Sequence, residues 1–512
     1  MEIKKICKTP EGLAALSGLS AGVVTHLFGL VNVLHNYDDI AQQPRGYGTG
    51  VTSGRWLLSL LGDFCEAIGG NYNLPLVNGL LFLLVISLTA SVIVSLLRIN
   101  NKKLAVLVGA LMTTFPSAFS TLAFRYTAVY YGVGILLSVV AAWVLLRYQY
   151  GLVLSALCTA CSLGIYQAYV PITIALFVLM LIRQTLEGEL PFWTLVRRGV
   201  YCCASLILGL VFYYLLMQVT LALYGTQLSN YQGVNEMGKL SLSQLPALVK
   251  EAYYTFLMMP LKDYCGVAAK RLLKIGYLLL AGSSAVLTGY ILLKRVKKIE
   301  MLLMAALLFL VFPLAVNFVV IMCPESWIYT LMVYSFVVVP CVPIVLLDCF
   351  LSSEEGRQEI RRWAEKGITA VLVVMICCYS YQTNVNYTAL YYSNRQIENY
   401  LSSMMVQVRM TEGFESDMPW AVIGEIEDPL LHSYWQYEMT YGGIEFTEWM
   451  LKRYSWPDWI RNYYGYSIPL LPAEQTQQLA GREEVIRMPC WPDQGSVRIV
   501  DDIVVIKCQP LQ

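Results

Sequence analysis

Charged residues are scarce in this sequence of 512 residues, where they make up only 14%. A soluble domain normally carries about a quarter, and 57% of the residues here are hydrophobic, so a soluble globular protein is excluded. The 36 basic and 35 acidic residues leave a formal net charge of +1, which lacks the basic surface that phosphate-backbone binding requires. The sequence therefore predicts an integral membrane protein without a nucleic acid partner.

Histidine is also rare, because the chain holds only three, His26, His35 and His432, and each stands singly. Zinc and di-metal sites usually draw several ligands from short motifs, so no metal site is expected; a divalent cation held by carboxylates stays open. The glycines of GYGTGVTSGR, residues 46–55, lack the spacing of a phosphate-binding loop, and no soluble strand precedes them. We therefore expect no nucleotide cofactor and a tight chain reversal at these glycines.

Cysteine is plentiful, with fourteen residues, but most of them lie inside apolar runs. A buried free cysteine behaves as a small hydrophobe. The pair Cys158 and Cys161 is flanked by apolar runs rather than by the electropositive helix start of a redox motif, so packing is its expected role. Cys490 and Cys508 lie in the polar tail, where they can pair if the tail is extracellular.

Long hydrophobic runs dominate the sequence. A transmembrane helix needs about 20 mostly apolar residues, and such runs cover 12–34, 74–97, 104–123, 127–146, 199–224, 276–293, 301–322, 328–348 and 367–382. The stretch 151–182 is too long for one helix without a steep tilt, and Gln167 and Pro171 interrupt it. We expect two short spans that meet near Tyr166, which makes about eleven transmembrane helices.

Lysines and arginines predict the orientation of these spans, because short cytoplasmic loops accumulate them. With eleven spans the cytoplasmic side receives Lys4, Lys5 and Lys8 and the clusters at 98–103, 147, 183–198, 294–298 and 357–366. The N-terminus is then cytoplasmic and the C-terminus extracytoplasmic. The cluster at 270–274 would then be extracytoplasmic. Counting 252–270 as another span would move this cluster to the cytoplasm, but it would place the cluster at 294–298 on the extracytoplasmic side.

The composition changes after residue 382, since 17 of the 35 acidic residues lie in the last 130 residues. We therefore expect a polytopic transmembrane domain, 1–382, with a first outer loop at 35–73, and a small extracytoplasmic α/β domain, 383–512. Alternating runs at 421–426 and 496–507 predict strands with a turn at Asp501 and Asp502. WPDW, YYGY and LLPAEQ between them suggest irregular aromatic loops.

The first outer loop carries the residues best suited to chemistry. Asp38 and Asp39 follow directly after the first apolar run, at the membrane surface, where adjacent carboxylates repel one another and call for a basic partner. Arg45 and Arg55 follow in the same loop. A carboxylate that takes a hydroxyl proton and guanidinium groups that neutralise a departing phosphate suit transfer from a phosphate-bearing lipid.

Structural roles compete with each of these assignments. An aspartate pair after a transmembrane helix can simply cap a short helix or hydrate the surface. From Trp56 to Gly70 apolar and polar residues separate onto two helical faces, which predicts a helix lying flat on the membrane, either at a lipid entry or as a strut.

Further polar residues are expected on the outer side. Arg125 lies between two spans among tyrosines, where it either holds a lipid phosphate or snorkels to the headgroups. Tyr166 and Gln167 at another outer turn offer hydroxyl and amide groups suited to a sugar, although tyrosine is common in aromatic belts without a ligand.

The order of several segments resembles a known family. NYDDIAQQPRGYGTGVTSGRWLL after the first span, FPSAFSTLAFRYTAVYYGVGILLS, SLGIYQAYVPITIALFVL and the closing RMPCWPDQGSVRIVDDIVVIK are similar to the bacterial type II (Gtr-type) O-antigen-modifying membrane glucosyltransferases. The resemblance covers nearly the whole chain. Each short piece is weak alone, and the order and spacing carry the likeness.

The resemblance implies a helical architecture of the GT-C glycosyltransferase kind and a specific reaction. Such enzymes move glucose, or a similar hexose, from an undecaprenyl-phosphate carrier to a cell-surface glycan at the outer face of the cytoplasmic membrane. They place an acidic residue of the first outer loop at the reaction centre, which here corresponds to Asp38 and Asp39. The lipid supplies the activated sugar, so the resemblance implies no nucleotide site. The resemblance assigns no role to Arg45, Arg55 and Arg125; their expected contacts with phosphate follow from their charge alone.

Two other functions fit a chain of many spans. A transporter or flippase for a polysaccharide precursor would carry polar or broken helices at the membrane midplane and internal repeats, whereas the polar residues here gather at the outer surface. A receptor or scaffold whose tail binds a partner would leave the acid and arginines of the first loop without a purpose.

Overall fold

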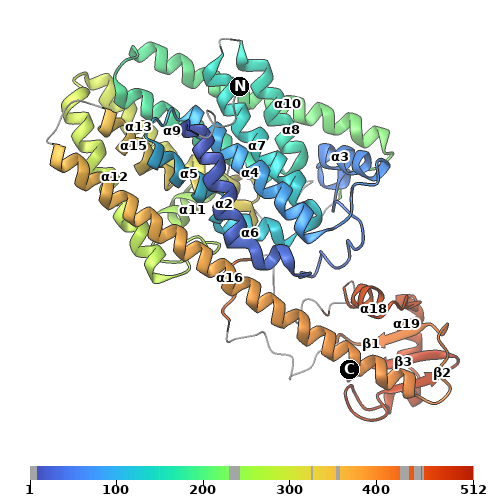
Figure 1. Cartoon of the computed structure of the whole chain (residues 1–512). Helices are drawn as coiled ribbons and strands as arrows, with labels where there is room; N and C mark the ends of the chain where they lie inside the picture. The colour runs from blue at the N-terminus through green and yellow to red at the C-terminus, as the bar shows by residue number, and fades with distance from the viewer. Residues whose placement is uncertain are drawn as a thin grey trace. The chain divides into compact units, whose positions relative to one another are not determined.

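The computed structural model describes residues 8–148, 150–229, 243–324, 327–352, 358–426, 437–442, 451 and 455–510 (Figure 1). Lys4, Lys5 and His432 lie outside the described residues. The chain forms two compact units. The first comprises Met1–Asn32, Gly46–Asn384 and Thr440–Gly443, and the second comprises Val33–Arg45, Val385–Met439 and Ile444–Gln512. Residues 33–45 of the first outer loop thus group with the C-terminal residues, and the expected boundary after residue 382 remains a prediction.

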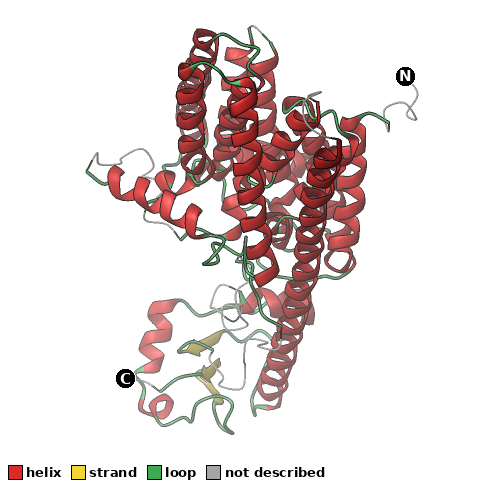
Figure 2. Cartoon of the chain, turned by 90° about the vertical axis from the view of Figure 1, so that its left-hand side faces the viewer, coloured by secondary structure: helices red, strands yellow, loops and turns green. Residues whose placement is uncertain are grey.

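The described part of the first unit is built from helices (Figure 2). Their bounds are α2 Pro10–Val31, α3 Trp56–Ala67, α4 Pro75–Leu96, α5 Lys102–Thr114, α6 Pro116–Ala123, α7 Arg125–Arg147, α8 Gly151–Ile165, α9 Val170–Glu187, α10 Phe192–Leu223, α11 Leu245–Met258, α12 Arg271–Arg295, α13 Ile299–Val316, α14 Val319–Met322, α15 Cys341–Ser352 and the first part of α16 Gln358–Met410. Three short 3-10 helices, η1 Val51–Ser53, η2 Gln167–Tyr169 and η4 Thr330–Val338, join them.

Ten of the described helical segments are long and apolar enough to cross a membrane, and α8 is a shorter apolar helix. The expected polytopic helical architecture is therefore confirmed. The stretch 151–182 breaks where the sequence predicted, because α8 ends at Ile165 and the short helix η2 leads from Tyr166 into α9. The alternative span at 252–270 contains only the end of α11, a helix of 14 residues.

Small residues bring the first helices of the bundle together. A Cβ atom on Gly109 of α5 would lie 2.1 Å from the carbonyl oxygen of Ala14 in α2, so only glycine permits this backbone approach. His26 of α2 is fully buried, and its Nε2 lies 2.9 Å from the carbonyl oxygen of Thr113 in α5. This histidine therefore serves as a packed hydrogen-bonding residue between two helices.

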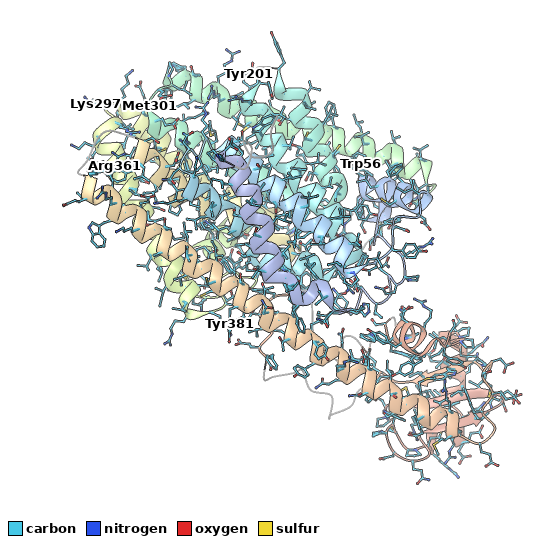
Figure 3. All side chains as sticks on the ribbon, viewed as in Figure 1. Trp56, Tyr201, Lys297, Met301, Arg361 and Tyr381 are labelled. Carbon is cyan, nitrogen blue, oxygen red and sulfur yellow. The ribbon has the colours of Figure 1, made fainter. Side chains whose placement is uncertain are left out.

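Arg295 and Arg361 both donate to carbonyl oxygens at the end of α15, those of Cys349 and Leu351, and we call this end of the first unit the basic end. Figure 3 shows Lys297 and Arg361 toward this end, away from Tyr381. Arg183 of α9 is buried here, and its guanidinium lies 3.1 Å from Asp348 of α15 and 2.7 Å from Glu187. Because buried charges need partners, this network ties α9 to α15 at the basic end.

The second unit contains the expected α/β fold. Strands β1 Trp420–Ile423, β2 Val497–Val500 and β3 Ile503–Lys507 form a sheet in the order β1-β3-β2, with β1 parallel and β2 antiparallel to β3. Asp501 and Asp502 have φ values of 49° and 56°, as the tight hairpin turn requires. Helices α18 Trp456–Tyr464, α19 Ala473–Ala480 and α20 Glu483–Ile486 complete the described elements.

Two local expectations for the C-terminal residues were wrong or incomplete. WPDW was expected in an aromatic loop, but it opens α18, which has Pro457 in its first turn and ends with the first two residues of YYGY, before Gly465 in the left-handed conformation. LLPAEQ was expected in a loop as well, but α19 begins at its Ala473. The last span was expected to end at residue 382, whereas α16 continues to Met410. Cys490 and Cys508 are free thiols in this structure, and no disulfide joins them.

Candidate functional site

A tight turn sets the first residues of α3 in the first unit. Gly54 ends η1 with φ of 71°, a left-handed conformation that favours glycine, and Arg55 follows as the N-cap of α3. Two side chains hold the turn from other helices: Gln167 Nε2 donates to the carbonyl oxygen of Ser53 at 2.9 Å, and the Tyr213 hydroxyl donates to that of Gly54 at 3.1 Å. The glycine reversal that the sequence predicted is therefore present, and it fixes the backbone that carries Arg55.

The guanidinium group of Arg55 lies against a group of buried tyrosines. Its Nη1 donates to the Tyr131 hydroxyl at 3.1 Å, and its Cζ lies 4.8 Å from the ring centroid of Tyr166. Tyr131 and Tyr166 stack at 4.7 Å, and Tyr169 contacts both rings edge-on. A cation on aromatic faces is held firmly, so this permanent positive charge has a defined position. We call Arg55, Tyr131, Tyr166, Gln167 and Tyr213 the arginine cluster.

Arg125 occupies the first position of α7, the helix that also carries Tyr131. Arg125 is 4% exposed, and its carbonyl oxygen accepts a hydrogen bond from Asn78 Nδ2 at 3.4 Å. The two positions are six residues apart, about 9 Å along a helix axis. The first unit therefore brings Arg55, Tyr166 and Gln167 into one cluster, and it places Arg125 on a helix that contributes to that cluster.

Asp63, on the polar face of α3, is half-buried and is held by two tyrosines, whereas Glu66 on the same face is exposed. Asp63 accepts hydrogen bonds from the hydroxyl groups of Tyr47, at 3.0 Å, and Tyr224. Burial, together with the Asp63 hydrogen bond, raises the pKa of Tyr47 to about 12, so its hydroxyl remains a donor at neutral pH. Leu60 and Phe64 on the other face are exposed, which is the pattern of a helix with an apolar face for lipid.

The aspartate pair lies in the second unit and its members differ. Asn36 caps the turn because its Oδ1 accepts from the backbone N–H groups of Asp38, at 3.0 Å, and Asp39, at 2.6 Å. Asp39 is 0% exposed, and its Oδ2 lies 2.6 Å from Nδ1 of His35, which is itself buried. Asp38 is half-buried, and Arg45 at the end of this segment is exposed.

The sequence did not single out His35 because lone histidines usually serve as core residues. Its position four residues before Asp39 was the available signal. Asn394 of α16 pairs with the backbone of His35 in both directions, with Oδ1 accepting at 2.8 Å and Nδ2 donating at 2.9 Å. Ser455, the residue before α18, holds the same segment, since it donates to the Tyr37 carbonyl oxygen at 3.0 Å.

The predicted candidate residues therefore fall into two groups. Asp38, Asp39 and Arg45 belong to the second unit, and Arg55, Arg125, Tyr166 and Gln167 belong to the first. Their roles remain predictions. Among the described residues no group of three or more His, Cys, Asp or Glu side chains could hold a metal ion.

The turn before Arg55 can be tested with a pair of matched glycines. Gly54→Ala is expected to cost at least about 1 kcal/mol more than Gly69→Ala, because its Cβ would lie 2.5 Å from the Tyr213 hydroxyl. Gly69 has nearly the same φ, +70°, but no heavy atom of the described residues lies within 4 Å of an added Cβ. Both substitutions lower the stability by a similar backbone strain of about 1–2 kcal/mol, because each places a side chain in the left-handed conformation. Thermal unfolding in detergent measures the difference, and equal destabilisation would show that the Tyr213 contact contributes nothing.

Comparison with known proteins gives one family match. The family model described as Glucosyl transferase GtrII matches residues 27–340. No curated protein matches the chain. The oligosaccharyltransferase of Archaeoglobus fulgidus, solved with zinc and sulfate, is 15% identical over 87% of this chain and 62% of its own, with a TM-score of 0.41.

A second solved structure is the archaeal oligosaccharyltransferase AglB of Archaeoglobus fulgidus with an inhibitory peptide and a dolichol-phosphate. It is 13% identical over 90% of this chain and 64% of its own, with a TM-score of 0.35. The match spans less than two thirds of the length of either oligosaccharyltransferase.

Proposed function

The chain belongs to the Glucosyl transferase GtrII family, and we propose that it is a polyprenyl-phosphate-sugar-dependent hexosyltransferase. In this proposal it moves glucose, or a similar hexose, from an undecaprenyl-phosphate carrier to a cell-surface glycan at the outer face of the cytoplasmic membrane. Membership of the family and the ten helical segments among the described residues that could cross a membrane support a membrane glycosyltransferase.

The observation that carries the donor assignment is the arginine cluster. A planar guanidinium binds phosphate through paired N–H groups, and Arg55 is oriented by Tyr131 at 3.1 Å and by the ring of Tyr166. A fixed cation stabilises negative charge that develops as a phosphate leaves, without reorganisation during the reaction. Arg125 is the second phosphate candidate in the same unit, and Gln167 supports the turn that positions Arg55.

The reaction needs a proton acceptor as well as a phosphate site. The acceptor hydroxyl oxygen forms a bond to the anomeric carbon, and the bond between that carbon and the carrier phosphate oxygen breaks. The carrier leaves as undecaprenyl phosphate, and the hydroxyl proton passes to a carboxylate. We assign this proton to Asp39, with Asp38 as the alternative, because Asp39 is buried and held in one orientation by His35.

Transfer is tested directly with labelled glucose on undecaprenyl phosphate, added to membranes from cells that produce the protein. We expect label to move from the lipid into glycan, and membranes without the protein to show no such transfer. If the labelled lipid changes leaflets while no new glycosidic bond forms, the chain is a transporter and the proposal is wrong.

The proposed orientation places the basic end of the first unit in the cytoplasm. Lys297 and Arg361 mark this end in Figure 3. We expect reporter fusions after residues 70 and 512 to report an extracytoplasmic location at both points. A cytoplasmic location for either point would contradict a reaction at the outer face. The first loop and the C-terminal residues would then lie on different sides of the membrane, or both would be cytoplasmic.

A further inference from the structure

The contact between His35 and Asp39 has the form of an orienting pair. The ring nitrogen Nδ1 lies 2.6 Å from carboxylate oxygen Oδ2, and the two residues are 2% and 0% exposed. Hydrogen bonds to a charged group are strong, and they strengthen further away from water. Because the bond engages one named oxygen, Oδ2, it restrains rotation of the carboxylate and so contributes to the direction in which Oδ1 points.

The backbone of both residues is fixed independently of this bond. Asn36 accepts from the N–H of Asp39 at 2.6 Å, and Asn394 makes two hydrogen bonds with the backbone of His35. The peptide segment is therefore anchored at both partners. The ring of His35 in turn restrains the side-chain torsion of Asp39.

The imidazole ring itself is clamped by aromatic neighbours on α18. Its centroid lies 5.6 Å from that of Trp459 at 89° and 6.0 Å from that of Tyr463 at 88°. Edge contacts of this kind favour one ring orientation. A ring that was needed only to fill space would not require a nitrogen directed at a carboxylate, so the packing and the hydrogen bond are two separable properties of His35.

We propose that His35 is a positioning residue for glycosyl transfer, which donates its Nδ1–H to Asp39 and so directs the other carboxylate oxygen toward the acceptor hydroxyl. This inference rests on the proposed function, because it concerns the carboxylate that takes the proton. The carboxylate selects the ring form that carries hydrogen on Nδ1, since only that form can donate. His35 itself takes no proton from the substrate.

Two substitutions separate the donor from the ring. His35→Asn retains an N–H donor near the place of Nδ1 but removes the ring, whereas His35→Phe retains the edge contacts with Trp459 and Tyr463 but removes the donor. We expect His35→Phe to lower kcat by on the order of 10²-fold with little change in the KM for the lipid donor, as misplacement of a reacting group does. We expect His35→Asn to keep kcat much closer to that of the unchanged protein.

The measurement uses the full chain in detergent or membranes, with thermal unfolding recorded for each variant. A purely structural histidine gives the reverse order, with His35→Phe active and His35→Asn unstable and inactive. Two folded variants that are equally inactive also overturn the proposal, because a ring nitrogen would then act on substrate directly. Asp39→Asn separates a failure of the positioning role from a failure of the proposed function. If Asp39→Asn is inactive while His35→Phe is active, only the positioning role of His35 is wrong. If Asp39→Asn is fully active, the assignment of Asp39 as the proton acceptor is wrong as well.

Discussion

Asp39→Asn is expected to lower glycosyl transfer by about 10²- to 10⁴-fold, the usual contribution of a positioned general base. The amide has nearly the shape of the carboxylate, and its oxygen can still accept from His35 Nδ1. It cannot take a proton, so the chemical step is lost while the local hydrogen bond is kept. Transfer of labelled glucose in membranes with matched protein levels measures the loss.

Asp38→Asn is the informative comparison because the two aspartates are adjacent in sequence but differ in the structure. Asp38 is half-buried, whereas Asp39 is fully buried next to His35. We expect a smaller loss from Asp38→Asn, and no loss from Asp502→Asn in the exposed hairpin turn. A larger loss from Asp38→Asn would transfer the role of base to Asp38, and full activity of the double mutant would remove both residues from the mechanism.

The membrane helices were predictable because one physical requirement, about 20 apolar residues per span, determines them. The extension of α16 was missed for the same reason. Beyond Tyr381 the helix is polar in composition, yet buried residues recur at three- and four-residue steps, as at Leu390, Asn394, Ile397 and Leu401. The helix continues because one face packs in the second unit, so an amphipathic period rather than apolar length was the signal.

The sequence named the residues of the candidate site, whose roles stay predictions, but it could not predict how they are arranged. Charge and position in the first loop selected Asp39 and Arg55, and the outer turn selected Tyr166 and Gln167. Their grouping depends on packing between helices far apart in sequence, because Gln167 reaches Ser53 across 114 residues. The sequence also placed Asp39 and Arg55 in one first loop, 35–73, and so suggested a single site. In the structure residues 33–45 belong to the second compact unit and Arg55 to the first.

Arg55→Gln is expected to lower kcat/KM for the lipid-linked sugar by about 10²- to 10³-fold, the loss that follows removal of one preorganised group that stabilises transition-state charge. Glutamine keeps a side-chain N–H but removes the positive charge that Tyr131 and Tyr166 hold in place. The kcat/KM of Arg55→Lys is expected to lie between that of Arg55→Gln and that of the unchanged protein, because an ammonium group keeps the charge but lacks the planar fork of the guanidinium. Steady-state transfer at varied donor concentration measures the effect.

Arg197 supplies the matched control, because it makes the same kind of contact elsewhere on the first unit. Its Nη2 donates to the Tyr201 hydroxyl at 3.2 Å, and its Cζ lies 5.4 Å from the ring centroid of Tyr201. Arg197→Gln removes an arginine on tyrosine at an exposed position, so it controls for loss of the cation–π contact alone. Equal activity of the Arg55→Gln and Arg197→Gln proteins would contradict the phosphate role. A loss confined to Arg55 would mean that removing an arginine from a tyrosine ring does not by itself lower transfer.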